Sequence, residues 1–184
     1  MIYWTLTFHE EKYRSVAPIK EAGWGTWRGL VTESSIHNWK PVQVGFRKSK
    51  GPDDRLIGDF FYIPSSIPIL TERALNLLKP LIESQVALLP LIFGEATLWI
   101  AYPTTIVDCY DKVASDFHTL ELPDKVVYGS AKNLVFHTGC VDDLHIFQLD
   151  VLKSNTTVSD EFKRIVDDNG LGGFMFRQVT HNEE

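Results

Sequence analysis

The sequence has little cysteine and no long hydrophobic run, and each shortage excludes a class of protein. Its 184 residues include only two cysteines, Cys109 and Cys140, too few for the disulfide framework of a small secreted domain. Both lie among apolar or small residues that suit buried thiols, so we expect them to be reduced. Pro90 interrupts the longest apolar run, Val86 to Phe93, which is far shorter than the roughly 20 residues of a membrane-spanning helix.

The first residues also lack the pattern of a secretory signal. The stretch MIYWTLTFHEEKY alternates as a strand does, and it carries carboxylates where a signal has its basic end and apolar stretch. We therefore expect a cytoplasmic protein.

Charge is unevenly distributed along the chain. The formal net charge is −6, but residues 1–50 hold eight Lys and Arg against four Asp and Glu, whereas residues 51–184 hold ten against twenty. The larger part should repel nucleic acid and anionic membranes, while it attracts a basic protein. An excess of carboxylates that keeps the surface soluble is the alternative explanation.

Length and composition predict a single domain over residues 1–184. Hydrophobic residues make up 44% of the chain and charged residues 23%, as in ordinary globular proteins with a substantial core. The loop RKSKGPDDR is the one internal boundary that the pattern suggests. If residues 1–50, a basic and Trp-rich subregion, pack on the acidic part 51–184, they neutralise some of its surface.

The order of predicted elements favours an α+β fold with a mostly antiparallel or mixed sheet. Thr71 can cap a helix over about 71–79, which Pro80 kinks or ends. Its apolar positions recur at three and four residues: Leu70, Ala74, Leu77, Leu78 and Leu81. Short strands separated by turns are predicted over residues 2–8, 41–46, 87–92, 97–101, 105–109, 126–128, 134–137 and 145–149.

The segment VSDEFKRIVDDNGLGGFMF predicts a second helix over about 159–169. Ser159 is a good N-cap, and Gly170 lies where a helix ends with a left-handed residue, with Leu171 packing back on the last turn. A phosphate-binding loop requires glycines before the N-terminus of a helix, whereas here they follow its carbonyl end. The glycines therefore indicate a corner that leads into a strand.

Histidine and cysteine gather in one stretch, His137-Thr-Gly-Cys140 with His145. The spacing matches no paired zinc motif, and the neighbouring Asp142 and Asp143 would raise the pKa of a nucleophilic thiol. We expect no catalytic group, no metal and no cofactor. A hydrolytic or metal-dependent enzyme centred on these three residues is the alternative.

Two further groups are candidates for binding. Carboxylates that could form a partner-facing patch or a catalytic pair stand at Asp108, Asp111, Asp116, Asp142 and Asp143. Trp24 and Trp27 could form an aromatic platform for a partner's side chain or for a sugar, although aromatics at this spacing most often pack into a core. A carbohydrate-binding module is thus a further alternative.

The C-terminal part resembles a known family. The runs ILTERALNLLKP, LLPLIF, WIAYPTTIVDCYDKVAS, LVFHTGCVDDLHIFQLD and VSDEFKRIVDDNGLGGFMFRQV, over about residues 60–180, are similar to a bacterial polymorphic-toxin immunity protein family. The resemblance implies a protein that binds a cognate toxin domain and blocks it. Its matching positions specify the fold rather than a site, so the acidic and aromatic residues above remain the predicted partner-binding surface.

Overall fold

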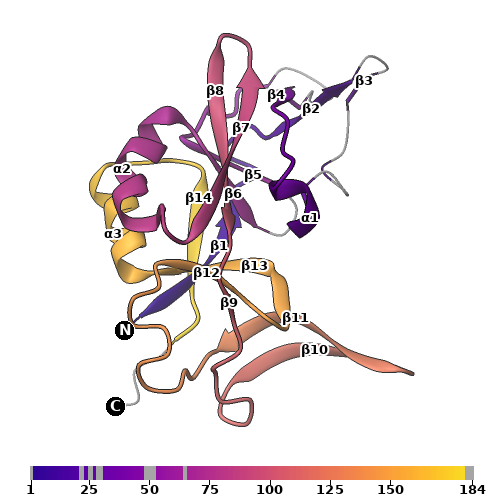
Figure 1. The fold of residues 1–184 in the computed structure, drawn as a ribbon, viewed down its shortest axis with the longest axis vertical. Helices are drawn as coiled ribbons and strands as arrows, with labels where there is room; N and C mark the ends of the chain where they lie inside the picture. The colour runs from indigo at the N-terminus through magenta and orange to yellow at the C-terminus, as the bar shows by residue number, and fades with distance from the viewer. Residues whose placement is uncertain are drawn as a thin grey trace.

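A computed structural model describes residues 2–20, 23–24, 27, 31–47, 53–63 and 66–180. Two β-sheets and a separate hairpin make up most of the fold, and two of the helices lie side by side against both sheets (Figure 1). The α+β class with mixed sheets is confirmed.

The first sheet has five strands in the order β14-β1-β13-β12-β9. Neighbours are antiparallel except β9 and β12, which are parallel. The N-terminal strand therefore lies between two C-terminal ones. The bounds are β1 Tyr3–Phe8, β9 Ile106–Val107, β12 Ile146–Leu149, β13 Leu152–Ser159 and β14 Phe174–Gln178.

The second sheet has seven strands in the order β3-β2-β4-β7-β8-β6-β5, with β4 and β7 parallel and the rest antiparallel. The first 50 residues supply strands to both sheets and are thus part of the framework. The bounds are β2 Val16–Lys20, β3 Gly23–Trp24, β4 Val42–Phe46, β5 Phe60–Ile63, β6 Ile67–Leu70, β7 Val86–Phe93 and β8 Ala96–Pro103.

The two predicted helices are present as α2 Glu72–Ile82 and α3 Asp160–Asp168, with a short α1 Glu33–Ile36 in addition. Thr71 caps α2 as expected, but Pro80 lies inside the helix instead of ending it. Pro80 and Asn76, whose carbonyl loses its partner, are both exposed, so water can satisfy that carbonyl. No helix among the described residues is long and apolar enough to cross a membrane.

The end of α3 confirms the predicted corner. Gly170 has a φ of 59°, and the amide of Leu171 donates to the carbonyl of Val166 over 3.0 Å while Gly170 donates to Asp167 over 3.1 Å. These are the two bonds of a glycine C-cap. Leu171 is buried against the last turn.

The other glycines of this corner serve close packing. The carbonyl of Gly172 accepts hydrogen bonds from the amides of Asp59, over 2.7 Å, and Phe60, over 3.0 Å. A Cβ on Gly172 would lie 2.6 Å from the Tyr13 hydroxyl, and one on Gly173 would lie 2.4 Å from the Phe60 carbonyl oxygen. The segment is filled by protein groups and leaves no room for a phosphate.

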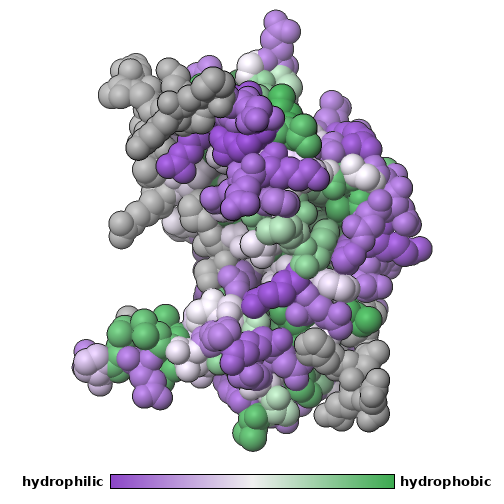
Figure 2. Space-filling model, turned by 180° about the vertical axis from the view of Figure 1, so that it is seen from behind, coloured by the Kyte–Doolittle hydropathy of each residue, from purple (hydrophilic) through white to green (hydrophobic). Residues whose placement is uncertain are grey.

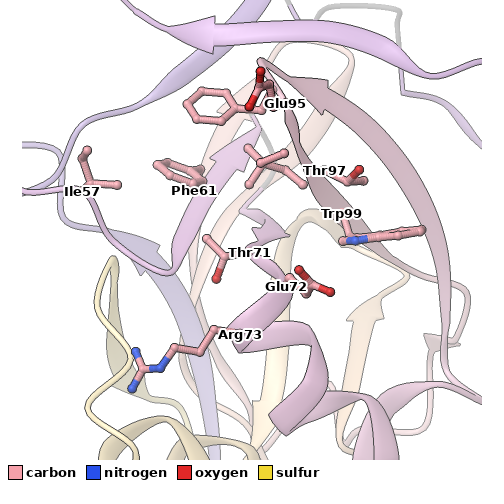
Figure 3. A pocket seen from close by; sticks show the side chains of 11 residues that line it. Ile57, Phe61, Thr71, Glu72, Arg73, Glu95, Thr97 and Trp99 are labelled. Carbon is pink, nitrogen blue, oxygen red and sulfur yellow. The ribbon is translucent and has the colours of Figure 1, made fainter.

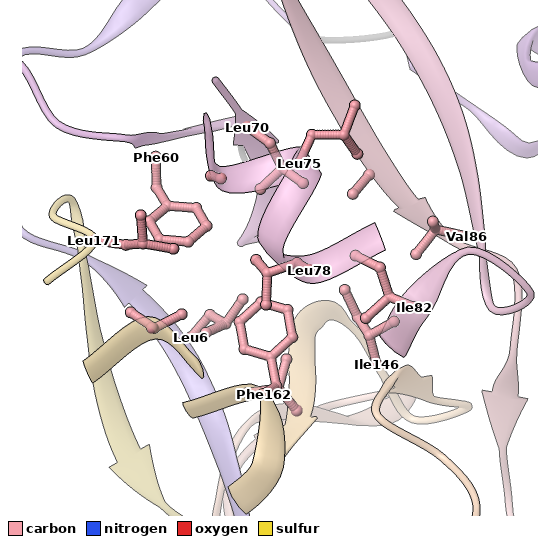
Figure 4. Packing of buried hydrophobic residues seen from close by; sticks show 14 residues of the cluster. Leu6, Phe60, Leu70, Leu75, Leu78, Ile82, Val86, Ile146, Phe162 and Leu171 are labelled. Carbon is pink, nitrogen blue, oxygen red and sulfur yellow. The ribbon is translucent and has the colours of Figure 1, made fainter. Parts of the chain in front are cut away.

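Neighbouring residues of a strand point to opposite faces of the sheet, so the buried residues form separate clusters. Phe60 and Leu70 belong to the cluster between the sheets and helices α2 and α3 (Figure 4), while their neighbours Phe61 and Ile69 belong to a cluster on the other face of the seven-stranded sheet. Leu70 is therefore a strand residue, which corrects its predicted place on the helical stripe. A third cluster lies on the outer face of the five-stranded sheet and includes Tyr3, Phe147 and Val179.

Some strand predictions were wrong. The expected strand 134–137 forms only an isolated bridge between Phe136 and Tyr110, and the expected strand 105–109 is reduced to β9. The sequence pattern also missed β13, which is rich in Thr and Ser. Thr156 and Thr157 are fully buried at the centre of a sheet, where β-branched side chains fit well.

The expectation of reduced cysteines was also wrong. Cys109 and Cys140 form a disulfide, with their Cα atoms 6.2 Å apart. The pattern around each residue indicated a buried thiol, but the pairing depends on the fold, which brings together two loops 31 residues apart in sequence.

Candidate partner-binding surface

The disulfide gathers four of the five predicted carboxylates at one end of the molecule. Asp108 and Asp111 flank Cys109, and Asp142 and Asp143 follow Cys140, so the bond brings the two pairs to neighbouring loops. We call residues 104–150 the acidic end, since they hold eight Asp and Glu against three Lys and Arg. This end lies at the bottom of Figure 1 and includes β9 and β12.

Three of these carboxylates are available to a partner. Asp108, Asp142 and Asp143 are exposed, and the described part of the chain offers their side chains no ion pair or hydrogen bond. Asp142 and Asp143 still act on the interior, because burial first, and these two carboxylates second, raise the pKa of Tyr3 to about 12.

The other two carboxylates have local structural roles. Asp111 accepts hydrogen bonds from the amides of Val113, over 2.8 Å, and Ala114, over 3.0 Å, and these bonds lower the pKa of its carboxyl. Asp116 forms an ion pair with Lys132 over 3.5 Å, across the two strands of the hairpin. Asp111 therefore holds a turn, and the charge of Asp116 is partly neutralised.

The predicted tryptophans lie away from the acidic end. Trp27 is partly buried in the cluster behind the seven-stranded sheet, and its indole N–H donates to the carbonyl of Val16 over 3.2 Å. The backbone of Trp24 is in β3, at the upper edge of Figure 1, and its side chain lies outside the described residues. The acidic and aromatic groups that the sequence suggested as one surface are thus separated.

The His and Cys candidates take part in hydrogen bonds and in the disulfide. His145 Nδ1 lies 2.9 Å from the Ser159 hydroxyl, which also caps α3 by accepting from the Phe162 amide over 3.2 Å. Cys140 is in the disulfide, and the backbone of His137 bonds to the loops beside it. Among the described residues no three His, Cys, Asp or Glu side chains form a group that could hold a metal ion.

A feature that the sequence only half revealed is the hairpin of β10, Asp116–Leu122, and β11, Lys125–Asn133. It projects from the acidic end, and Figure 2 shows its apolar side chains as a green projection at the lower left, with a polar tip. Leu120 is 61% exposed and Val126 51% exposed. The alternation in FHTLEL and the Pro-Asp turn were the available signals.

Within the described structure, the hairpin is anchored at its base. Phe117 and Ala131, which face each other across the strands, pack into the third core cluster. Towards the tip, apolar side chains stand in water on both faces, because Leu120 pairs with Val127 on one face while Val126 pairs with Glu121 on the other.

An open hollow of about 520 Å³ lies on a different part of the molecule, at the start of α2 (Figure 3). Phe61 and Trp99 line it together with Thr71, Glu72 and Glu95. Arg73 at its margin is engaged by Asp59 over 2.9 Å and by the carbonyl of Asn169 over 2.6 Å. The hollow has aromatic and acidic walls but presents no catalytic arrangement among the described residues.

The family comparison places the acidic end within a recognised segment. Residues 93–181 match the model of an immunity protein family, Imm11. The matched segment contains the disulfide, the hairpin and α3, but it begins later than the resemblance expected from about residue 60. No curated protein matches the chain. The resemblance to an immunity protein family is confirmed, and it supports an immunity role.

Proposed function

Because residues 93–181 match the Imm11 immunity proteins, we propose that this protein binds a cognate bacterial toxin of a polymorphic toxin system and neutralises it by stoichiometric occlusion. The family match carries this proposal. In it the chain acts by binding rather than by catalysis, and its partner is a protein.

The acidic end supports the choice of surface. The exposed carboxylates of Asp108, Asp142 and Asp143, which have no ion pair within the described part of the chain, lie in the matched segment, as does the exposed hairpin. A surface of one charge speeds the encounter with a basic partner, and rapid capture protects a cell that makes the toxin itself. The exposed apolar side chains of the hairpin would supply the buried contacts that usually carry most of the affinity.

The test uses the product of the gene next to this one, co-expressed with the chain. We expect the chain to restore growth of cells that this product inhibits, and to form a one-to-one complex with a dissociation constant in the nanomolar range or tighter by calorimetric titration. A chain that leaves growth inhibited and gives no heat of binding would contradict the proposal.

The cytoplasmic location is also a proposal, and the disulfide gives a way to test it. Disulfides persist in oxidising compartments and are rare in the cytoplasm. If the protein is cytoplasmic, we expect the Cys109–Cys140 bond of the structure to be reduced in the cell, so that both residues are trapped as thiols when cells are lysed in an alkylating reagent. Full recovery of the bonded form from growing cells would instead place the protein in an oxidising compartment.

A further inference from the structure

The hairpin has two outer strand edges, and among the described residues neither is paired with another strand. Unpaired edges present rows of amide and carbonyl groups that can pair with another chain, and natural proteins usually shorten, charge, bulge or cover them. The two edges of this hairpin differ in that respect.

The edge of β11 is interrupted. Consecutive β10 residues Asp116 and Phe117 pair with Asn133 and Ala131, so Lys132 is an extra residue in β11. In the same way His118 pairs with Ser130 and Thr119 pairs with Tyr128, which leaves Gly129 extra. Each bulge bends and twists its own strand, and this disrupts regular pairing along its outer edge.

The edge of β10 is regular. All seven residues from Asp116 to Leu122 take a β11 partner in turn, with no extra residue on this strand. Residues Thr119 to Leu122 are exposed, so no side chain of the described structure covers this end of the edge. A strand added here would also cover Leu120 and Leu122.

We propose that the toxin docks on the outer edge of β10, by pairing an extended basic segment of the toxin domain with this strand. The inference rests on the proposed function and names the mode of recognition. Main-chain hydrogen bonds along an edge give affinity, and side chains on the two faces give specificity.

Charge favours the toxin over a second copy of this chain as the partner that pairs with β10. The hairpin belongs to the acidic end, where eight Asp and Glu stand against three Lys and Arg. Pairing of β10 with β10 of another copy would bring two such ends together and cost free energy through like-charge repulsion. A basic segment meets the opposite sign.

The first experiment is hydrogen–deuterium exchange on the full chain, alone and in complex with the product of the adjacent gene. We expect peptides that cover residues 116–122 to exchange more slowly in the complex, and to gain more protection than peptides from β11. A tight complex in which residues 116–122 exchange as in the free chain would overturn the inference and leave the proposed function intact. A failure to form any complex would overturn both.

The second experiment places a lysine on the edge. Leu120→Lys removes an apolar contact and adds a charge that repels a basic segment, so we expect affinity to fall by about tenfold or more. Val113→Lys is the matched control, because Val113 is 96% exposed on the same acidic end but outside the hairpin, and it should change affinity by about twofold at most. Equal losses in the two variants would contradict docking on β10.

Sedimentation of the free chain tests whether a second copy of this chain pairs with the edge of β10. We expect a monomer at micromolar concentration. A dimer whose residues 116–122 are protected from exchange in the absence of any partner would show that a second copy covers the edge, and would overturn the assignment to the toxin.

Discussion

At the scale of single residues, Tyr3 ties the first strand to the acidic end. Its ring packs edge-on against Phe136 and Phe147, and its hydroxyl donates to the carbonyl of Val141, next to Asp142 and Asp143. Burial first, and these carboxylates second, raise the pKa of Tyr3 to about 12. One buried phenol thus joins the core to the exposed carboxylates.

This pKa predicts how stability depends on pH. A tyrosine whose pKa is about 10 when unfolded and about 12 when folded contributes stability that is complete below pH 10 and is lost as the pH rises to 12. Tyr3→Phe lacks this contribution, so we expect its free energy of unfolding to lie about 1 kcal/mol below wild type at pH 8. In urea titrations the gap should narrow above pH 10 and reverse sign before pH 12, because only wild type loses stability there. A gap that stays constant to pH 12 would contradict the assignment.

Gly170 and Gly173 make a second prediction at this scale. Both have a positive φ, but a Cβ on Gly170 meets open space whereas one on Gly173 lies 2.4 Å from the Phe60 carbonyl oxygen. We expect Gly170→Ala to lower the free energy of unfolding by about 1 kcal/mol and Gly173→Ala to lower it by more than about 2 kcal/mol. Urea unfolding of the two variants measures the difference. Similar losses would show that the chain at Phe60 moves to make room.

At the scale of elements, the sequence was informative where interactions are local. Ser159, Gly170 and Leu171 act within a few residues of the helix they delimit, and all three predictions were confirmed. The disulfide was missed because it depends on loops far apart in the chain. Of the hairpin only residues 126–128 were predicted as a strand, although the alternation in FHTLEL also indicates one. The sequence named five carboxylates as candidates for partner binding, but the fold is needed to distinguish Asp111, which holds a turn, from Asp108, which is exposed.

The disulfide is expected to stabilise the folded chain. It closes a loop of 31 residues that contains the hairpin, and loop closure of that length is worth about 3 to 4 kcal/mol in the chain-entropy model. We expect the double change Cys109→Ser and Cys140→Ser to lower the free energy of unfolding by about this amount. Wild type unfolded under reducing conditions is the matched control and should give a similar loss. An unchanged stability in both would show that the bond does not constrain the unfolded chain.

At the scale of the whole molecule, carboxylates are concentrated at one end, although the N-terminal and C-terminal parts of the chain both contribute strands to the sheets. The N-terminal strands are spread over both sheets, and the strands β2, β3 and β4 lie at the end of the molecule opposite the acidic end (Figure 1). These strands therefore do not cover the carboxylates at Asp108, Asp142 and Asp143. A partner meets an acidic pole rather than a uniformly acidic surface.

The concentration of carboxylates at one end predicts how fast the chain associates with a basic partner. The triple change Asp108→Asn, Asp142→Asn and Asp143→Asn should slow association with the adjacent-gene product by about tenfold at low salt, with little effect on dissociation, because charge acts mainly on the encounter. A matched control with the same loss of charge is Glu72→Gln, Glu95→Gln and Asp168→Asn, all exposed and outside the acidic end. Stopped-flow measurements at several salt concentrations compare the two. Equal slowing would assign the effect to net charge instead of to the pole.

The way the hairpin is attached has a consequence for evolution. Among the described residues of the hairpin, Phe117 and Ala131 at its base pack into the core. Substitutions at residues 119–124, 126 and 127 exchange exposed side chains and therefore cost little folding free energy. The lineage can therefore alter this arm one residue at a time while both sheets and the helices remain intact. If the proposed function holds, this arrangement lets the surface that binds the toxin change as the toxin changes, while the two sheets and the helices stay the same.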